Sequence, residues 1–196
     1  MSPDSLSLIL ASSSPYRAEL LAKLGLGFIS VSPDIDETPL PDEAPDTLVA
    51  RLAKAKAEAV ASTHPHALII ASDQVAVLND TILGKPGNHQ NAFQQLKSAS
   101  GNKVTFLTSL ALMNSDRQRI QLAVIPFNVY FKPLTPSQIE NYLNAEQPYQ
   151  CAGAFKSEGL GISLFEKLEG DDPNTLIGLP LIQLIKMLER EKVNII

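Results

Sequence analysis

The stretch LILASSSPYR, residues 8–17, gathers side chains that could bind an anion. An apolar run ends in three serines, and a proline, a tyrosine and an arginine then lead into AELLAKLG, which has the pattern of a helix. A strand-to-helix turn of this kind places backbone N–H groups, hydroxyls and a cation around one small volume. Ser12 and Arg17 are therefore candidate anion ligands, and the dipole of the following helix adds to the attraction.

A second candidate cation, Lys56, lies in the segment 47–62, where the periodicity predicts a long helix capped by Asp46. At 100° per residue, Lys56 falls in the middle of an apolar stripe made of Val49, Leu52, Ala53 and Val60. The opposite face carries Arg51, Lys54 and Glu58, which need no further explanation. A lysine on the core-facing side must extend to the surface, pair with a carboxylate or meet a bound anion, and the pattern alone slightly favours the first two.

Acidic side chains follow two predicted strands. Asp34, Asp36 and Glu37 lie in a proline-rich loop after the strand FISVS, and Asp73 comes where the strand ALIIAS ends. Carboxylates at strand ends of an open α/β sheet lie where ligands usually bind, and a pair of them can hold a hard divalent cation or orient a water. A solvated turn is the ordinary explanation of Asp36, and an Asx turn or cap competes for Asp73.

Two further segments give weaker signals. Lys85 lies in the turn GKPG (84–87), which lacks the spacing of a phosphate-binding P-loop, and a lysine in a turn is usually a surface residue. The segment CAGAFKSEGLG (151–161) surrounds Glu158 with small residues that let a backbone approach a flat ligand closely. Taken alone, an ordinary surface loop explains this second segment better.

The elements that must position these residues mix strands and helices irregularly, which predicts an α/β sheet with some antiparallel pairs. Helices are predicted at 15–24, 47–62, 89–98, 135–145 and 180–191. Strands are predicted at 6–11, 28–32, 67–72 with 74–78, 103–113, 120–131 and within 161–170. The last helix has an apolar face made of Leu181, Ile182, Leu184, Ile185 and Leu188.

Composition narrows the class of protein. A chain of 196 residues with 44% hydrophobic and 19% charged residues is an ordinary globular protein, long enough to bury a core. The net charge of -5 gives no global attraction for long nucleic acids. The single Cys151 cannot form an intramolecular disulfide, and we expect no signal peptide or membrane span, so the cytoplasm is the predicted location.

Several segments together resemble the Maf family of nucleotide pyrophosphatases, in the same order and over nearly the whole chain. They are LILASSSPYR, DIDET, RLAKAKA, SDQV, GKP, ASGNKVTF, CAGAFKSEGLG and DPNTLIGLPL. Within the family the chain resembles the YceF branch, which acts on 7-methyl-GTP, more than the dTTP/UTP branch. It departs from the branch pattern at Tyr16, where tryptophan is expected, and at Ala18, where a second arginine can occur.

The resemblance implies one Maf-like domain over residues 1–196, with an elongated, ITPase-like mixed sheet flanked by helices and two lobes around a central cleft. It implies a cytoplasmic enzyme, with a homodimer suggested, that cuts a nucleoside triphosphate between its α and β phosphates with a divalent metal, Mg²⁺ or Mn²⁺. The implied substrate-binding residues are Ser12, Arg17, Lys56 and Lys85. The implied metal-binding acids are Glu37 and Asp73, Asp73 matches the proposed proton acceptor, and the implied specificity residues are Tyr16, Gln74 and Glu158.

The implied roles agree with the chemistry of the residues. N7-methylguanine carries a positive charge, so an aromatic ring such as Tyr16 can stack on it, and a carboxylate such as Glu158 can accept from its N1–H and N2–H₂ edge. Gln74 can both donate and accept. Two alternatives remain: the same hydrolysis with dTTP or UTP, against which Glu158 argues because it offers no donor to a pyrimidine, and a nucleotide-binding regulator of septum formation without catalysis.

Overall fold

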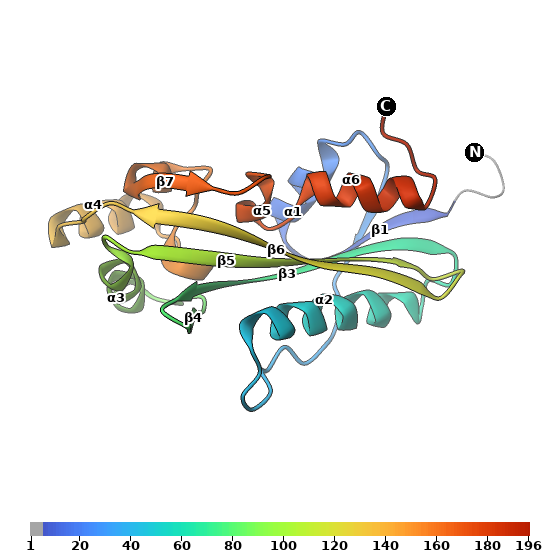
Figure 1. Cartoon of the computed structure of the whole chain (residues 1–196), viewed down its shortest axis with the longest axis horizontal. Coiled ribbons are helices and arrows are strands. Elements are labelled where there is room, and N and C mark those ends of the chain that lie inside the picture. Colours follow the sequence, from blue (N-terminus) through green and yellow to red (C-terminus); the bar gives the residue numbers. More distant parts are fainter. Residues whose placement is uncertain (1–5) are drawn as a thin grey trace. The chain divides into compact units, whose positions relative to one another are not determined.

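A mixed seven-stranded sheet organises the computed structural model of the chain, which describes residues 6–196 (Figure 1). The order is β2-β1-β3-β5-β6-β7, with β4 paired to β3. Strand β1 runs parallel to β2 and β3, whereas β4 pairs with β3 and β7 with β6 in antiparallel fashion. The strands are β1 (Ser7–Ala11), β2 (Ile29–Val31), β3 (Ala67–Leu78), β4 (Thr81–Leu83), β5 (Lys103–Asn114), β6 (Arg119–Phe131) and β7 (Phe165–Glu169). The predicted mixed α/β fold is confirmed.

Helices connect these strands. The α-helices are α1 (Pro15–Ala22), α2 (Pro45–Ala61), α3 (His89–Ala99), α4 (Pro136–Glu146), α5 (Asn174–Ile177) and α6 (Leu181–Arg190). Two short 3₁₀ segments, η1 (Ala152–Ala154) and η2 (Leu160–Leu164), precede β7. Within residues 6–196, each helix is too short or too polar to cross a membrane.

The chain divides into two compact units. Unit 1 comprises residues up to 73, 108–125 and 178–196, and unit 2 comprises 74–107 and 126–177. The long strands β3, β5 and β6 therefore contribute residues to both units. A single domain over the whole chain stays a prediction.

The core of unit 1 joins α2 to one face of the strands. Alternate residues of a strand point to the same face, so Ile9 of β1 and Ile69 and Ala71 of β3 meet the apolar side of α2 at Ala53 and Ala57. Helix α6 lies on the other side of these strands (Figure 1). Successive side chains of β3 in unit 1 therefore alternate between the face that packs on α2 and the face toward α6.

The core of unit 2 is aromatic. Phe131, Phe155 and Phe165 pack edge to face against one another, with ring centroids 4.8 to 5.7 Å apart. Phe106 adds a further edge contact to Phe155 at 5.3 Å. Edge-to-face rings align the positive ring edge with the negative ring face, which stabilises this arrangement beyond the area that it buries.

Two predictions of local structure were wrong. The segments 67–72 and 74–78 form one strand, β3, so Asp73 lies inside a strand and not at its end. Asp46 does not cap α2, because the helix begins at Pro45 with Ala44 as its N-cap, and the Asp46 carboxylate accepts a hydrogen bond from the Thr47 N–H instead. Proline is favoured at this first helical position because its missing N–H has no partner to lose.

Two helices also differ from prediction at their ends or faces. Helix α1 ends at Ala22, and the N–H of Gly25, which has a φ of 68°, turns back to the Ala22 carbonyl. In α6, Ile182 is 45% exposed and Met187 is buried, so the apolar face is rotated from the predicted one. The sequence pattern counted branched aliphatic residues and overlooked the methionine.

The N-terminus of α4 generates a prediction on stability. Thr135 and Gln138 form a capping box, in which the Thr135 hydroxyl accepts from the Gln138 N–H and the Gln138 side chain accepts from the Thr135 N–H. We expect Thr135→Ala to lower the free energy of unfolding by about 1 kcal/mol, measured by urea denaturation, because the Gln138 N–H loses its hydroxyl acceptor. Thr135→Ser keeps the hydroxyl and is the control; equal losses in both variants would contradict the capping role.

Candidate active site

Lys56 is a buried cation held between two carboxylates. Its Nζ lies 2.5 Å from Oδ1 of Asp73 and 2.7 Å from Oε1 of Glu37. The side chains of Lys56 and Asp73 are 7% and 12% exposed, whereas that of Glu37 is 59% exposed. Of the three options that the sequence left open, the structure shows the pairing with carboxylates, and Lys56 does not extend to the surface.

The backbone of Asp73 is fixed by a hydroxyl from the neighbouring strand. The Asp73 N–H donates to Oγ of Ser109 at 3.0 Å, and this hydroxyl donates in turn to the Asp73 carbonyl at 3.2 Å. Ser109 is fully buried in β5. Ser109 was not predicted from the sequence, although the polar Thr108–Ser109 pair between the apolar residues of this strand was a usable signal.

Arg17 lies in the first turn of α1, close to both acids. Its backbone N–H donates to the Ser14 hydroxyl that caps the helix, and its side-chain Nε donates to the Gly178 carbonyl at 2.9 Å. Desolvation lowers the pKa of the Arg17 guanidinium, and the charges of Asp73 and Glu37 oppose that shift. Arg17 is therefore within electrostatic reach of the acids that contact Lys56.

The serine-rich turn before α1 has the form that the sequence predicted. Ser12 is buried, and its Oγ accepts a hydrogen bond from the Ser14 N–H at 3.1 Å. Tyr16 is 38% exposed at the start of α1. The turn thus fixes the helix N-terminus, with Arg17 on one side and an accessible aromatic ring next to it in the chain.

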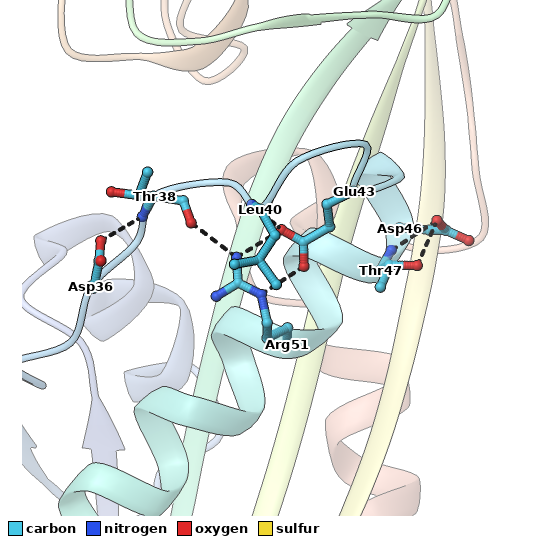
Figure 2. Close-up of polar contacts among 7 residues, drawn as sticks. All are labelled: Asp36, Thr38, Leu40, Glu43, Asp46, Thr47 and Arg51. Atoms are coloured by element: carbon cyan, nitrogen blue, oxygen red, sulfur yellow. Dashed lines mark hydrogen bonds and ion pairs between the residues drawn. The ribbon is translucent and has the colours of Figure 1, made fainter.

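The loop that carries Glu37 is held by an arginine of α2 (Figure 2). The Arg51 guanidinium forms a bidentate pair with Glu43, with Nε–Oε1 and Nη2–Oε2 distances of 2.6 and 2.7 Å, and Nη2 also donates to the Thr38 carbonyl at 3.1 Å. Sequence analysis gave Arg51 no role, because it lies on the helix face opposite the core. Its partners Glu43 and Thr38 lie 8 and 13 positions earlier in the chain, outside the helix, so these contacts leave no periodic signal.

Asp36 has the structural role that the sequence favoured. Its Oδ1 accepts a hydrogen bond from the Thr38 N–H at 2.8 Å in an exposed turn, which lowers the pKa of the Asp36 carboxyl (Figure 2). Glu37, the residue between them, is the one that reaches Lys56. The turn therefore fixes the backbone from which the Glu37 side chain extends to Lys56.

Lys85 and Glu158 belong to unit 2. The Lys85 turn is anchored because the Gly84 carbonyl accepts from Gln95 and the Gly87 N–H donates to the Tyr149 carbonyl. Burial raises the pKa of the Cys151 thiol; Lys156 lowers it, Glu158 raises it, and Lys85 lowers it. Within unit 2, the charges of Lys85 and Glu158 thus act on the same thiol.

Gln74, the third predicted specificity residue, also belongs to unit 2, and its side chain binds backbone carbonyls of that unit. Its Nε2 donates to the carbonyls of Thr175 and Leu176 at 2.9 and 3.2 Å. The donor half of this amide is therefore engaged with the segment around α5. The sequence did not reveal this contact, because the partners are about a hundred positions away in the chain.

The residues of unit 1 can perform two kinds of chemistry. Arg17 and Lys56 are cations of a kind that can bind phosphate oxygens, and Glu37 and Asp73 are carboxylates that can accept a proton or a divalent cation. Within residues 6–196, three or more acidic, histidine or cysteine side chains do not gather as they would in a complete metal cage. The fold and this charge cluster define an α/β protein suited to a phosphorylated ligand.

Comparison with known proteins agrees with that class. Residues 7–191 match the model of a family described as Maf-like protein, and the chain belongs to this family. It is 60% identical over 189 residues to a relative from Nitrosococcus oceani, covering 96% of this chain and 95% of the relative. Relatives from Aliivibrio fischeri and Pseudomonas aeruginosa are 55% and 57% identical, and each alignment covers 96% of this chain and 98% of the relative. All three are named 7-methyl-GTP pyrophosphatase, which confirms the resemblance to the Maf family.

The buried Lys56 generates a prediction on stability. Lys56→Met keeps the length of the side chain but leaves Asp73 buried without its ammonium partner, so we expect the free energy of unfolding to fall by on the order of 3 kcal/mol. Lys54→Met is the matched control on the same helix, because Lys54 forms only an exposed pair with Glu58 at 3.7 Å. Denaturation curves for both variants provide the measurement, and equal losses would show that the buried pair is not stabilising.

The loop clamp generates a prediction on pH. The Arg51 hydrogen bond lowers the pKa of Glu43 from an ordinary value of 4.5 to about 2. Because the pKa in the folded state is depressed, the stabilisation is complete above about 4.5 and is lost as pH falls toward about 2. We expect the difference in denaturation midpoint between the parent chain and Glu43→Gln to narrow over this interval, and a difference that does not vary with pH would argue against the clamp.

Proposed function

We propose that this chain is a nucleoside triphosphate pyrophosphatase that hydrolyses 7-methyl-GTP to 7-methyl-GMP and diphosphate, and so removes a modified nucleotide. The observation that carries the proposal is the buried Lys56 ammonium, held between Glu37 and Asp73 with Arg17 beside them. This cluster occurs in a chain 55% to 60% identical to relatives that bear the name of this activity.

The cations of unit 1 bind the triphosphate. Arg17 offers a planar set of donors that suits phosphate oxygens, and Lys56 offers a point charge. The N-terminus of α1 adds a partial positive charge, and Ser12 lies in the turn that fixes it. Lys85 contributes a further cation, as the family resemblance implies. Together these groups offset the negative charge that develops on the leaving diphosphate.

Asp73 accepts the proton of the attacking water. The water oxygen forms a bond to the α-phosphorus, its proton passes to the Asp73 carboxylate, and the bond to the bridging oxygen breaks as diphosphate leaves. The hydrogen bonds between Ser109 and the Asp73 backbone support this role, because a general base must be held in register with the water.

Glu37 and Asp73 hold a divalent cation, Mg²⁺ or Mn²⁺. The fit rests on their common contact with the Lys56 ammonium, which brings the two carboxylates within reach of one positive centre. Mg²⁺ is commonly bound through one or two carboxylates, with substrate phosphates and water completing its ligands, so two acids are sufficient. When bound, the metal supplies charge neutralisation at the phosphate oxygens.

Base selection rests on Tyr16, Glu158 and Gln74. The exposure of Tyr16 supports stacking on the positively charged ring of 7-methylguanine. The exposed carboxylate of Glu158 suits the guanine N–H edge. The bonds of Gln74 to the carbonyls of Thr175 and Leu176 favour an indirect contribution through the backbone that it holds.

We further propose that the enzyme acts in the cytoplasm on free nucleotides, as a homodimer. The single cysteine, which forms no disulfide, supports a reducing compartment. The absence of a basic net charge supports a small nucleotide and not a long nucleic acid as the ligand. Light scattering of the purified chain measures its oligomeric state directly.

A nucleotide panel tests the proposed function. We expect release of diphosphate from 7-methyl-GTP at least tenfold faster than from GTP, dTTP or UTP, measured with and without Mg²⁺ or Mn²⁺, because Tyr16 and Glu158 gain most from a charged purine. Asp73→Asn should lower the rate by a factor on the order of a hundred or more while the chain stays folded.

Controls in the same panel separate catalysis from specificity. Glu158→Gln should reduce the preference for 7-methyl-GTP over GTP, because a neutral amide loses the charge-assisted hydrogen bonds. Faster release of diphosphate from dTTP or UTP than from 7-methyl-GTP would show that the proposed substrate is wrong. Tight nucleotide binding in calorimetry without any release of diphosphate would favour the non-catalytic regulator.

A further inference from the structure

The carbonyl of Gly178 receives two side-chain hydrogen bonds from different elements of unit 1. Nε of Arg17 and Oγ of Ser72 each donate to it at 2.9 Å. A carbonyl oxygen has two lone pairs, so both bonds form together. Ser72 is fully buried, and nothing in the proposed chemistry uses its hydroxyl directly.

The alternation of β3 explains why Ser72 reaches this carbonyl. Successive side chains of a strand point to opposite faces, so Asp73 points to α2 and Lys56, whereas Ser72 points to the other face. Gly178 lies there, shortly before α6 begins. Ser72 and Asp73 are therefore neighbours in β3 with different partners. Asp73 is the proposed base, and Ser72 binds the same Gly178 carbonyl as the phosphate-binding Arg17.

The glycine itself fits close to the guanidinium. Gly178 has a φ of 125°, a conformation that residues with a side chain rarely adopt. A Cβ at this position would lie 3.3 Å from Nε of Arg17. The backbone thus approaches Arg17 as closely as its hydrogen bond requires, and a side chain here would press on the guanidinium.

The bond to Nε limits how Arg17 can bind a ligand. In the part of the chain that the structure describes, acidic side chains form no ion pair with Arg17 within 4.0 Å, so its two terminal NH₂ groups are not taken by carboxylates. A guanidinium can bind an oxyanion side-on, through Nε and one NH₂, or end-on, through both NH₂ groups. With Nε donated to Gly178, the end-on mode remains.

We propose that Ser72 is a positioning residue, which orients Arg17 through the Gly178 carbonyl so that the two terminal NH₂ groups are presented end-on to the substrate phosphates. This inference rests on the proposed function and deepens it. The Ser72 hydroxyl holds the Gly178 peptide plane, and that plane holds the guanidinium. Loss of the hydroxyl leaves the peptide free to tilt, and the orientation of Arg17 relaxes.

The test uses two variants of equal shape. Ser72→Thr keeps a hydroxyl and Ser72→Val replaces it by a methyl group, so any cost of the added bulk is common to both. We expect kcat for 7-methyl-GTP to be about tenfold lower in Ser72→Val than in Ser72→Thr, with KM changed less, because misorientation affects phosphate contacts formed in the transition state. Thermal denaturation of both variants checks that they are folded.

The same pair is then compared in an Arg17→Lys background. Lysine has no Nε–H to donate to Gly178 in this geometry, so the positioning is already lost and the Thr and Val variants should have equal kcat. A purely structural Ser72 would give the same tenfold ratio in both backgrounds, which would overturn the proposal. If added bulk prevents folding, Ser72→Ala is compared with the parent chain in the two backgrounds in the same way.

A binding measurement separates this inference from the proposed function. Calorimetry with inorganic tripolyphosphate measures phosphate binding without any nucleotide chemistry. Because tripolyphosphate makes ground-state contacts only, we expect a smaller effect than on kcat, with about threefold weaker binding to Ser72→Val than to Ser72→Thr and no such ratio with Arg17→Lys. If no nucleotide releases diphosphate, the proposed function fails while this ratio still decides the positioning role. Equal affinities, or no binding to the parent chain, would overturn the positioning role itself.

Discussion

Burial of the Lys56 charge is the constraint on which the rest of unit 1 depends. An ammonium group in a core is costly unless carboxylates replace the water that it loses, and Asp73 and Glu37 do so here. This requirement fixes the rotation of α2 over the strands and places an acid inside β3, where aspartate is disfavoured. It also requires the loop after β2 to return to the helix, and the Arg51–Glu43 pair holds it there.

Buried hydroxyl groups and backbone atoms hold the charged residues of unit 1 in position. Ser109 holds the backbone of Asp73, and Ser72 reaches the Gly178 carbonyl that binds Arg17. Because these hydroxyls are buried in strands, their rotamers are restricted and their partners are fixed. A charge cluster supported in this way has a fixed geometry, and preorganisation of that kind is what phosphoryl chemistry demands of a protein.

Much of this could be predicted from the sequence, because the signals were local. The strand–serine–helix turn, the lysine in an apolar stripe and the acidic loop each follow from residue types a few positions apart. Asp73 was recognised as unusual but was placed at a strand end, since an acid between two apolar runs looks like a break. The strand continues through Asp73 because β3 pairs with β1 before it and with β4 after it, and the Ser109 hydroxyl bonds the N–H and carbonyl of Asp73 itself.

The sequence by itself determined the α/β class, the family and the identity of the charged residues, because these depend on composition, order and short spacings. The tertiary structure decided which charges meet. It pairs Lys56 with Glu37 and Asp73, and it pairs Arg51 with Glu43. It also brings the Gly178 carbonyl within hydrogen-bond distance of Arg17, although the two residues are 161 positions apart in the chain. Contacts of this range depend on the register of strands and the rotation of helices. Such quantities are set by packing of the whole core and leave no trace in a short stretch of sequence.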